Sequence, residues 1–175
     1  MKKLIIINGT MGVGKTAVCK ELNRALGGSV WLDGDWCWMM NPFIANDYNK
    51  RMVEENIGFL LRSFLNNPAY EYVIFDWVID REEIYKAILD QVGECRFELF
   101  KITLQCSESE LRKRIAKDLL NGDRTEANLR DSLSRRGLYD KIRSTKIDTS
   151  KMSVGKVVEE IAKIVDSCND IPKTL

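Results

Sequence analysis

The stretch IIINGTMGVGKTAVCK, residues 5–20, constrains the fold more than any other part of the chain. An apolar run enters a glycine-rich turn, and an amphipathic helical pattern follows. Residues 9–16 match G-x-x-x-x-G-K-[ST] at every position. Glycines let consecutive backbone N–H groups curl around an anion, and the helix that follows points its positive dipole end at the same place. This stretch therefore predicts a strand, a phosphate-binding turn and a helix.

The turn predicts a binding site for ATP with Mg²⁺. Lys15 is expected to reach the β- and γ-phosphates, and the Thr16 hydroxyl is expected to ligate Mg²⁺. The strand before the turn and the helix after it are the context in which this motif binds nucleotides. In this stretch the residues expected to contact the nucleotide are Gly9, Thr10, Met11, Gly12, Val13, Gly14, Lys15, Thr16 and Ala17.

Strand-like and helix-like segments alternate along the rest of the chain, which favours an α/β fold with a parallel sheet. No repeat, low-complexity segment or linker divides the chain. We therefore expect one domain over residues 1–168 and a tail over residues 169–175. The predicted strands are Leu4–Asn8, Ser29–Leu32, Tyr72–Asp76, Phe97–Gln105 and Thr145–Asp148.

Composition excludes several classes of function. Lys and Arg total 27 against 26 Asp and Glu, so net charge gives no support to a polyanion-coating role. The apolar runs are too short to span a membrane, and no signal-peptide pattern is visible. The five cysteines lack metal-ligand spacing, which favours free thiols in a reducing cytosol. Because the chain has no histidine, we expect any general base to be a carboxylate.

Carboxylates follow two of the predicted strands. Asp33 and Asp35 flank Gly34 after the second strand, and Asp76 ends the third in the hydrophobic-run-plus-acid pattern called Walker B. The carboxyl ends of parallel strands line the ligand crevice, so these side chains should lie near the γ-phosphate. Strand alternation would let Asp33 and Asp35 face the same side. One could then help to hold Mg²⁺ while the other accepts a proton from an attacking hydroxyl.

The segments GTMGVGKT and LDGD and the basic segment from Leu111 onward together resemble the small P-loop kinases of the shikimate kinase, gluconate kinase and chloramphenicol phosphotransferase type. These kinases share the nucleoside monophosphate kinase fold, among the AAA-type ATP-binding domains. The resemblance implies a three-layer α/β/α fold with a five-stranded parallel sheet in the order 2-3-1-4-5. It also implies a helical lid at about residues 114–136.

The resemblance also implies roles for individual residues. Asp33 corresponds to the metal-side aspartate and Asp35 to the aspartate that contacts the acceptor hydroxyl, while Asp76 is a further magnesium-side candidate. In the L-x-x-R pattern of the lid, Arg114 would lie against the adenine, and Arg124 would close on the phosphates. Thr149 belongs to the loop that resembles the base-contacting loop. The expected catalytic residues are Lys15, Asp35 and Arg124, and the expected metal residues are Thr16, Asp33 and Asp76.

The chain departs from the shikimate kinase pattern after the third strand. A triple-glycine substrate turn is replaced by Asp76-Trp77-Val78-Ile79, which argues against shikimate as the acceptor. Four tryptophans fall near the predicted acceptor side, and an apolar or planar acceptor would follow if two or three line the cleft. Two shorter expectations concern neighbouring residues: Asp80 should cap the next helix, and Arg135 and Arg136 are further lid candidates. The four tryptophans are Trp31, Trp36, Trp38 and Trp77.

Our interpretation is an ATP-dependent kinase that phosphorylates a hydroxyl of a small molecule, cytoplasmic and either monomeric or homodimeric. Three alternatives stay open. A GTPase is suggested by Thr145-Lys146-Ile147-Asp148, but no D-x-x-G follows the third strand. An ATP-binding module that sequesters a ligand without transfer is the second. A nucleic-acid end kinase is the third, supported only by the excess of basic residues between Arg112 and Arg143.

Overall fold

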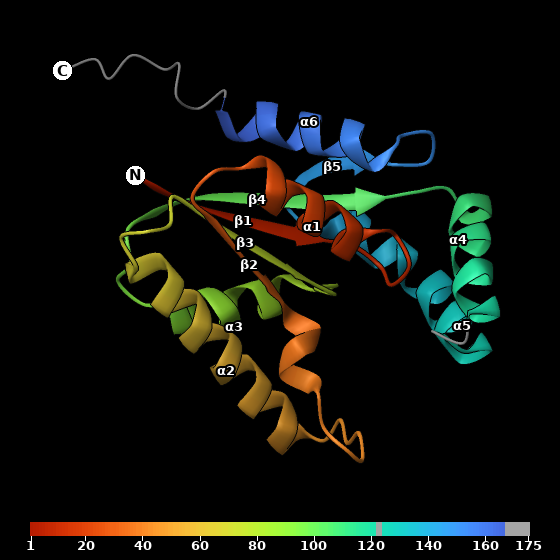
Figure 1. Ribbon diagram of the computed structural model, residues 1–175. Helices are drawn as coiled ribbons and strands as arrows, with labels where there is room; N and C mark the ends of the chain where they lie inside the picture. The colour runs from red at the N-terminus through yellow and green to blue at the C-terminus, as the bar shows by residue number, and fades with distance from the viewer. Residues whose placement is uncertain (122–123, 167–175) are drawn as a thin grey trace.

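The computed structural model of the chain describes residues 1–121 and 124–166. Its centre is a five-stranded sheet in the order β2-β3-β1-β4-β5, with all neighbouring strands parallel (Figure 1). This confirms the predicted α/β fold and strand order. The strands are β1 (Lys2–Asn8), β2 (Ser29–Asp33), β3 (Tyr72–Trp77), β4 (Phe97–Gln105) and β5 (Thr145–Asp148).

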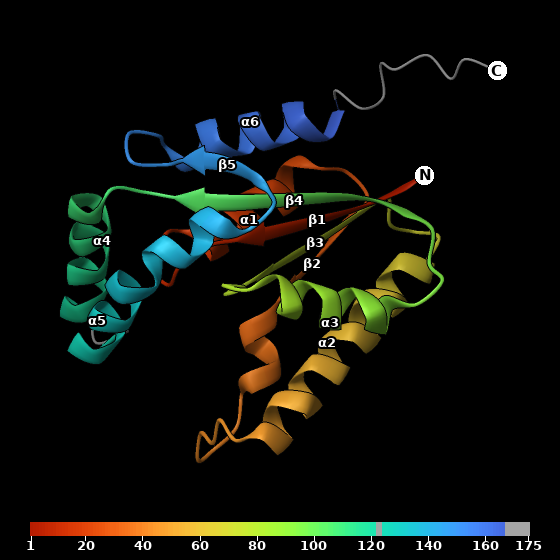
Figure 2. The same cartoon turned by 180° about the vertical axis from the view of Figure 1, so that it is seen from behind.

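Helices cover both faces of this sheet and so form three layers (Figures 1 and 2). Strand β1 is buried on both sides because its residues alternate between two apolar cores. Ile5 and Ile7 pack in the core beneath α1 and α6, whereas Leu4 and Ile6 pack in the core beneath α2 and α3. These helices are α1 (Lys15–Ala25), α2 (Asp47–Asn66), α3 (Glu82–Val92) and α6 (Val154–Asp166).

The remaining helices lie near the carboxyl ends of the strands. The 3₁₀ helix η1 (Gly34–Trp38) follows β2, and α4, α5 and η2 connect β4 to β5 (Figure 2). Ser107 caps α4, since its Oγ accepts from the Glu110 N–H. The predicted lid therefore corresponds to the segment that holds α4 (Glu108–Leu120), α5 (Glu126–Arg135) and the start of η2 (Arg136–Lys141).

Two other predictions concern the C-terminal tail and the cysteines. The tail expected from residue 169, and Cys168 before it, lie outside the described residues. The four described cysteines are free thiols: Cys19, Cys37, Cys95 and Cys106. None of the described helices combines the length and the apolarity that a bilayer crossing requires.

Candidate active site

The glycine-rich turn between β1 and α1 closes against the lid. Gly12 adopts φ +81°, and a Cβ added there would lie 2.6 Å from Ile115 Cγ1 of α4. A side chain at this position would therefore be strained and would push α4 away. The turn and the lid helix are consequently built as one unit, with glycine required at their contact.

Lys15, at the start of α1, folds back over this turn. Its Nζ donates to the carbonyls of Gly9 at 3.0 Å and Thr10 at 3.2 Å. Burial lowers the pKa of Lys15, and three nearby carboxylates oppose that shift. The ammonium group is thus held where a triphosphate would lie, among negative charges that favour its protonated form. The carboxylates are those of Asp76, Asp35 and Asp33.

Asp33 and Asp35 converge on Lys15, but not through the predicted strand alternation. Strand β2 ends at Asp33, whose Oδ1 accepts from the Asp35 N–H at 3.0 Å and so caps η1. Its Oδ2 accepts from Thr16 Oγ1 at 3.2 Å. The turn is tight because a Cβ on Gly34 would lie 2.6 Å from Cγ of the Trp77 ring. Glycine between the two aspartates is therefore required by packing.

Asp76 ends the apolar part of β3 and is buried, with 1% of its surface exposed. The Trp31 indole N–H donates to its Oδ1 at 2.6 Å, and the Cys19 thiol also hydrogen bonds to it. Burial, followed by the charge of Asp33, raises the pKa of Asp76 to about 7. No sequence signal indicates the Trp31 and Cys19 contacts, because they depend on how β2, β3 and α1 pack together.

Asp35 is the most open of the three carboxylates and is exposed at the start of η1. Burial by the surrounding protein raises its pKa, and the charge of Asp33 adds to the rise. Lys15 and a hydrogen bond from the Trp77 indole oppose it. An accessible carboxylate with a raised pKa suits the acceptance of a proton from a hydroxyl group.

Arg124 comes from the segment between α4 and α5. Its Nε donates to Asp118 Oδ2 at 2.8 Å. Its positive charge acts on both Lys15 and Asp35, lowering the pKa of each. Of the three residues that the sequence predicts to be catalytic, Lys15 and Asp35 lie close enough to shift each other's pKa, whereas Arg124 acts on both more weakly and is paired with Asp118.

Arg114 ties α4 to both the glycine-rich turn and the loop after β5. Its guanidinium donates to the Val13 carbonyl at 2.8 Å, to Thr149 Oγ1 at 3.0 Å and to the Thr149 carbonyl at 2.8 Å. Its Nε donates to Glu110. Because these hydrogen bonds occupy the edges of the guanidinium group, its flat face remains available to stack against a nucleotide base. The buried Thr149 hydroxyl also donates to the Gln105 carbonyl, so this residue shapes the loop.

The helix α5 is anchored to the glycine-rich turn by a residue that the sequence did not single out. Ser132 is buried; its carbonyl accepts from Thr10 Oγ1 at 3.1 Å, and its Oγ donates to the Met11 carbonyl at 3.1 Å. Ser132 is one of two serines in α5, and nothing in the sequence distinguishes it. These contacts place α5 directly against the predicted nucleotide site.

A second anchor corrects the prediction for Asp80. The N-cap of α3 is Arg81, with no side-chain cap bond, so Asp80 does not cap the helix. Instead, its buried carboxylate accepts two hydrogen bonds from Arg135 at the end of α5 and lies 3.4 Å from Arg81 Nε. The local capping rule failed because a tertiary ion pair uses the same carboxylate.

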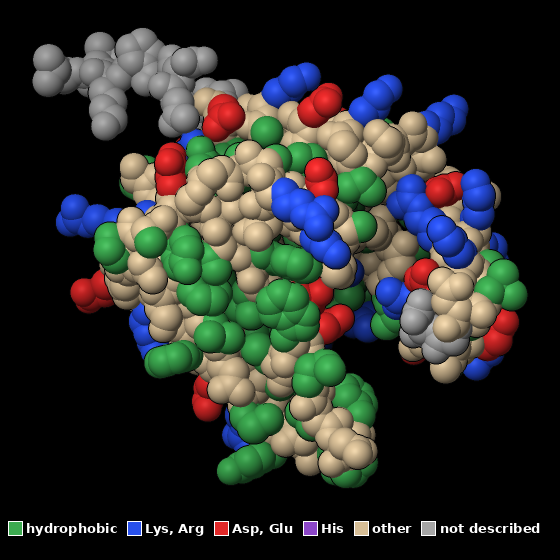
Figure 3. Space-filling view, in the orientation of Figure 1, with side chains coloured by type: hydrophobic (Ala, Val, Ile, Leu, Met, Phe, Trp, Pro, Cys, Tyr) green, Lys and Arg blue, Asp and Glu red, His purple; other side chains and the backbone are tan. Residues whose placement is uncertain are grey.

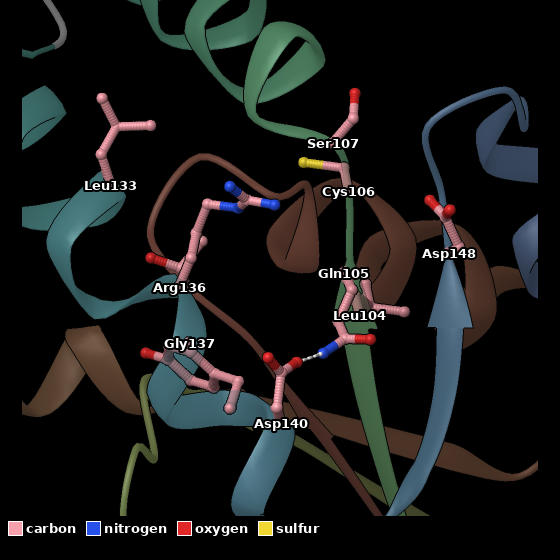
Figure 4. A pocket seen from close by; sticks show the side chains of 11 residues that line it. Leu104, Gln105, Cys106, Ser107, Leu133, Arg136, Gly137, Asp140 and Asp148 are labelled. Atoms are coloured by element: carbon pink, nitrogen blue, oxygen red, sulfur yellow. Dashed lines mark hydrogen bonds between the residues drawn. The ribbon is translucent and has the colours of Figure 1, made fainter.

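The other lid candidate, Arg136, points into a cavity of about 430 Å³ that Thr10 of the glycine-rich turn also lines (Figure 4). This cavity lies between the end of β4 and η2, where Gln105 Nε2 donates to Asp140 Oδ1 at 2.6 Å. None of the three carboxylates around Lys15 lines it. We therefore place the candidate active site at Lys15 and not at this cavity.

Lys146 and Asp148, which imitate a guanine-reading pattern, are engaged within the protein. Lys146 Nζ donates to the carbonyls of Tyr139 and Ile142. Asp148 accepts from the N–H and the hydroxyl of Ser150, and these bonds lower its pKa. Both side chains are therefore used in contacts within the protein, and neither indicates a guanine-binding site.

The donor set fits a magnesium ion bound together with a nucleotide. Among the described residues, no group of three or more His, Cys, Asp or Glu could hold a metal ion alone. Mg²⁺ usually keeps several waters and takes one or two protein ligands beside substrate phosphates. The adjacent Thr16 hydroxyl and Asp33 carboxylate match that requirement.

Comparison with known proteins identifies the family of the chain. A family model described as "AAA domain" matches residues 5–135, from β1 to the end of α5. The chain belongs to this AAA domain family. The match includes the glycine-rich turn, the three carboxylates and both lid arginines, Arg114 and Arg124. No curated protein sequence matches the chain.

Several solved structures share the fold of this AAA domain. The Deinococcus radiodurans tunicamycin resistance protein superposes with a TM-score of 0.70 at 20% identity, covering 94% of this chain and 96% of its own. A gluconokinase from Sinorhizobium meliloti 1021 gives 0.66 at 18%, covering 96% and 95%. Shikimate kinase from Acinetobacter baumannii, in complex with shikimate, gives 0.65 at 19%, covering 98% and 97%. These similarities confirm the predicted resemblance to small P-loop kinases at the level of the fold.

Proposed function

We propose that this protein is an ATP-dependent phosphotransferase that moves the γ-phosphoryl group to a hydroxyl of a small molecule. The observation that supports it best is the convergence of Lys15, Arg124 and the open carboxylate of Asp35 at one glycine-rich turn. In this proposal, Lys15 and Asp35 lie at the γ-phosphate, and Arg124 leaves Asp118 to join them when ATP binds. Phosphoryl transfer requires positioning and charge neutralisation of this kind.

In the proposed reaction, the acceptor oxygen attacks the γ-phosphorus in line. A new P–O bond forms, the bond to the β-phosphate oxygen breaks, and ADP leaves with that electron pair. Asp35 takes the proton of the acceptor hydroxyl. Lys15 and Arg124 neutralise the charge on the phosphates. Mg²⁺, held at Thr16 with Asp33 behind it, would supply further neutralisation when bound with ATP.

The test separates ATP binding from transfer. Purified protein is incubated with Mg²⁺-ATP and a panel of hydroxyl compounds, and ADP release above the no-acceptor rate is measured. Lys15→Ala should abolish turnover, whereas Asp35→Asn should still bind ATP but lose transfer. Asp90→Asn, on the exposed surface of α3, serves as the matched control and should keep full activity. Undiminished transfer by Asp35→Asn would refute the assigned base.

The same assay distinguishes the alternatives. An ATP-binding module that sequesters a ligand would bind ATP without phosphorylating any acceptor, and Asp35→Asn would not affect it. A nucleic-acid end kinase would phosphorylate oligonucleotides and bind them in a salt-dependent way. We further propose a cytoplasmic monomer or homodimer, which sedimentation and cell fractionation would test.

A further inference from the structure

An exposed tryptophan stands directly beside the proposed base. Trp36 follows Asp35 in η1, and 51% of its surface is exposed. Its ring centroid lies 4.9 Å from that of Trp31, with the planes tilted by 55°. Trp31 is itself fixed by its hydrogen bond to Asp76. The Trp36 ring therefore packs on a side chain that is itself held in place, and its exposed part is an ordered aromatic surface.

The apolar surface continues from Trp36 into the lobe formed by η1, the loop after it and the start of α2. We call this the apolar lobe; on the face seen in Figure 3, hydrophobic side chains gather over this part of the molecule and few charges interrupt them. Within the lobe, Trp38 packs on Phe43 with ring centroids 5.6 Å apart. Exposed apolar side chains of this size usually mark a binding surface. Its exposed members are Trp36, Met39, Phe43, Ile44 and Tyr48.

The charges around the apolar lobe do not suit an acidic ligand. Beside the lobe lie the three carboxylates of the site. On α2, Lys50 is paired with Asp47 at 3.1 Å, and the exposed Arg51 follows it without an ion pair among the described residues. Across the site, Arg135 and Arg81 share the single carboxylate of Asp80. Lys15 and Arg124 are taken by the phosphates in the proposed reaction. A carboxylate on the acceptor would thus lie beside Asp33 and Asp35, while the cations that act on Asp35, Lys15 and Arg124, are engaged by the phosphates.

We propose that the acceptor is a neutral or cationic hydroxyl compound with a planar apolar ring, which stacks on Trp36 while its hydroxyl reaches Asp35. Trp36 is then the specificity-determining residue of the site. This inference rests on the proposed function, since it describes the acceptor of that reaction. The apolar lobe is contiguous with the reacting carboxylate, which favours a small acceptor over a separate macromolecular partner.

Two ligands that differ in charge test whether a carboxylate on the acceptor weakens binding. The compounds 1-phenyl-1,2-ethanediol and mandelate share a phenyl ring and a hydroxyl, but mandelate carries a carboxylate where the diol carries a second alcohol. Binding is measured by calorimetry at millimolar ligand, with Mg²⁺ and a non-hydrolysable ATP analogue present. We expect the diol to bind at least about tenfold more tightly, because an unpaired charge is penalised by more than about 1.4 kcal/mol.

Two variants test how much the Trp36 ring contributes to binding of the diol. Trp36→Ala should weaken diol binding by a factor between about two and ten, the range of aromatic pairing. Phe59→Ala removes an equally exposed aromatic ring from α2, outside the apolar lobe, and should leave binding unchanged. Circular dichroism and ATP-analogue binding report whether Trp36→Ala remains folded.

The outcomes separate this inference from the proposed function. Equal binding of the two probes, no binding of the diol, or an unaltered diol affinity in Trp36→Ala overturns the inferred acceptor class. A dimer that Phe43→Asp dissociates, with no diol binding, assigns the lobe to a second copy and overturns it as well. Transfer of phosphate to gluconate by the same protein would refute the acceptor class while supporting the proposed function. Failure to bind ATP would instead refute the proposed function.

Discussion

The pH dependence of stability follows from Asp76, whose buried carboxylate has a pKa of about 7 in the folded chain. In an unfolded chain an aspartate titrates near a pKa of about 3.9. Between these values the folded chain keeps a proton that the unfolded chain has released, so the free energy of unfolding falls as the pH rises. The full loss is about 4 kcal/mol, of which about 2.5 kcal/mol falls between about pH 5 and about pH 8.

The assay is urea unfolding of the nucleotide-free protein at these two pH values, for the natural chain and for Asp76→Asn. Asparagine is neutral, and its oxygen can still accept from the Trp31 N–H. The loss of unfolding free energy between the two pH values should therefore shrink by about 2.5 kcal/mol in the variant. Other titrating groups, such as Lys15 and Asp35, contribute to both proteins and largely cancel in the difference.

Asp90→Asn provides the control, since its exposed carboxylate pairs only with Lys86 on the surface of α3. This variant should keep the pH dependence of the natural chain. If Asp76→Asn showed the same pH dependence as the natural chain, the pKa of Asp76 would not be raised by burial, and the reasoning would be refuted.

Three further predictions concern the walls of the site. Gly34→Ala places a Cβ against the Trp77 ring; it should cost about 1–3 kcal/mol of stability and reduce transfer by moving Asp35, and a melting temperature and rate like those of the natural chain would contradict this. Arg114→Lys cannot bridge the glycine-rich turn and the loop after β5 together, so ATP affinity measured by calorimetry should fall; unchanged affinity would count against that bridge. Asp80→Ala frees Arg135, so amide hydrogen exchange should accelerate in α5 but not in β1, and equal protection of α5 would show that the ion pair does not hold the lid.

The strands and the glycine-rich turn could be predicted because their signals are local. An apolar run such as Leu4–Asn8 needs only its own residues to be recognised, and the observed β1 extends that range by two residues. The turn at residues 9–16 could be recognised from its motif, although the steric need for glycine at position 12 comes from Ile115 of α4. The carboxylates were placed correctly at the strand ends by the same rule, because parallel strands share one carboxyl edge.

The remaining features depend on packing between distant segments. Asp33 caps η1 and accepts from Thr16, so its two oxygens are used in ways that strand alternation does not describe. Asp80 binds Arg135, which lies 55 residues further along the chain. The same holds for the Trp31 contact on Asp76 and the Ser132 contact on the turn. Each requires knowledge of which elements lie side by side.

The most direct test of the proposed kinase activity follows the γ-phosphorus itself. Mg²⁺-ATP labelled at the γ-phosphate is incubated with the protein and 1-phenyl-1,2-ethanediol, and the products are separated. We predict that the label appears as a phosphate ester of the diol in equal amount to ADP, and that Lys15→Ala and Asp35→Asn form none. Tight binding of ATP with the label confined to ATP or inorganic phosphate, across the diol and the whole acceptor panel, would contradict the account.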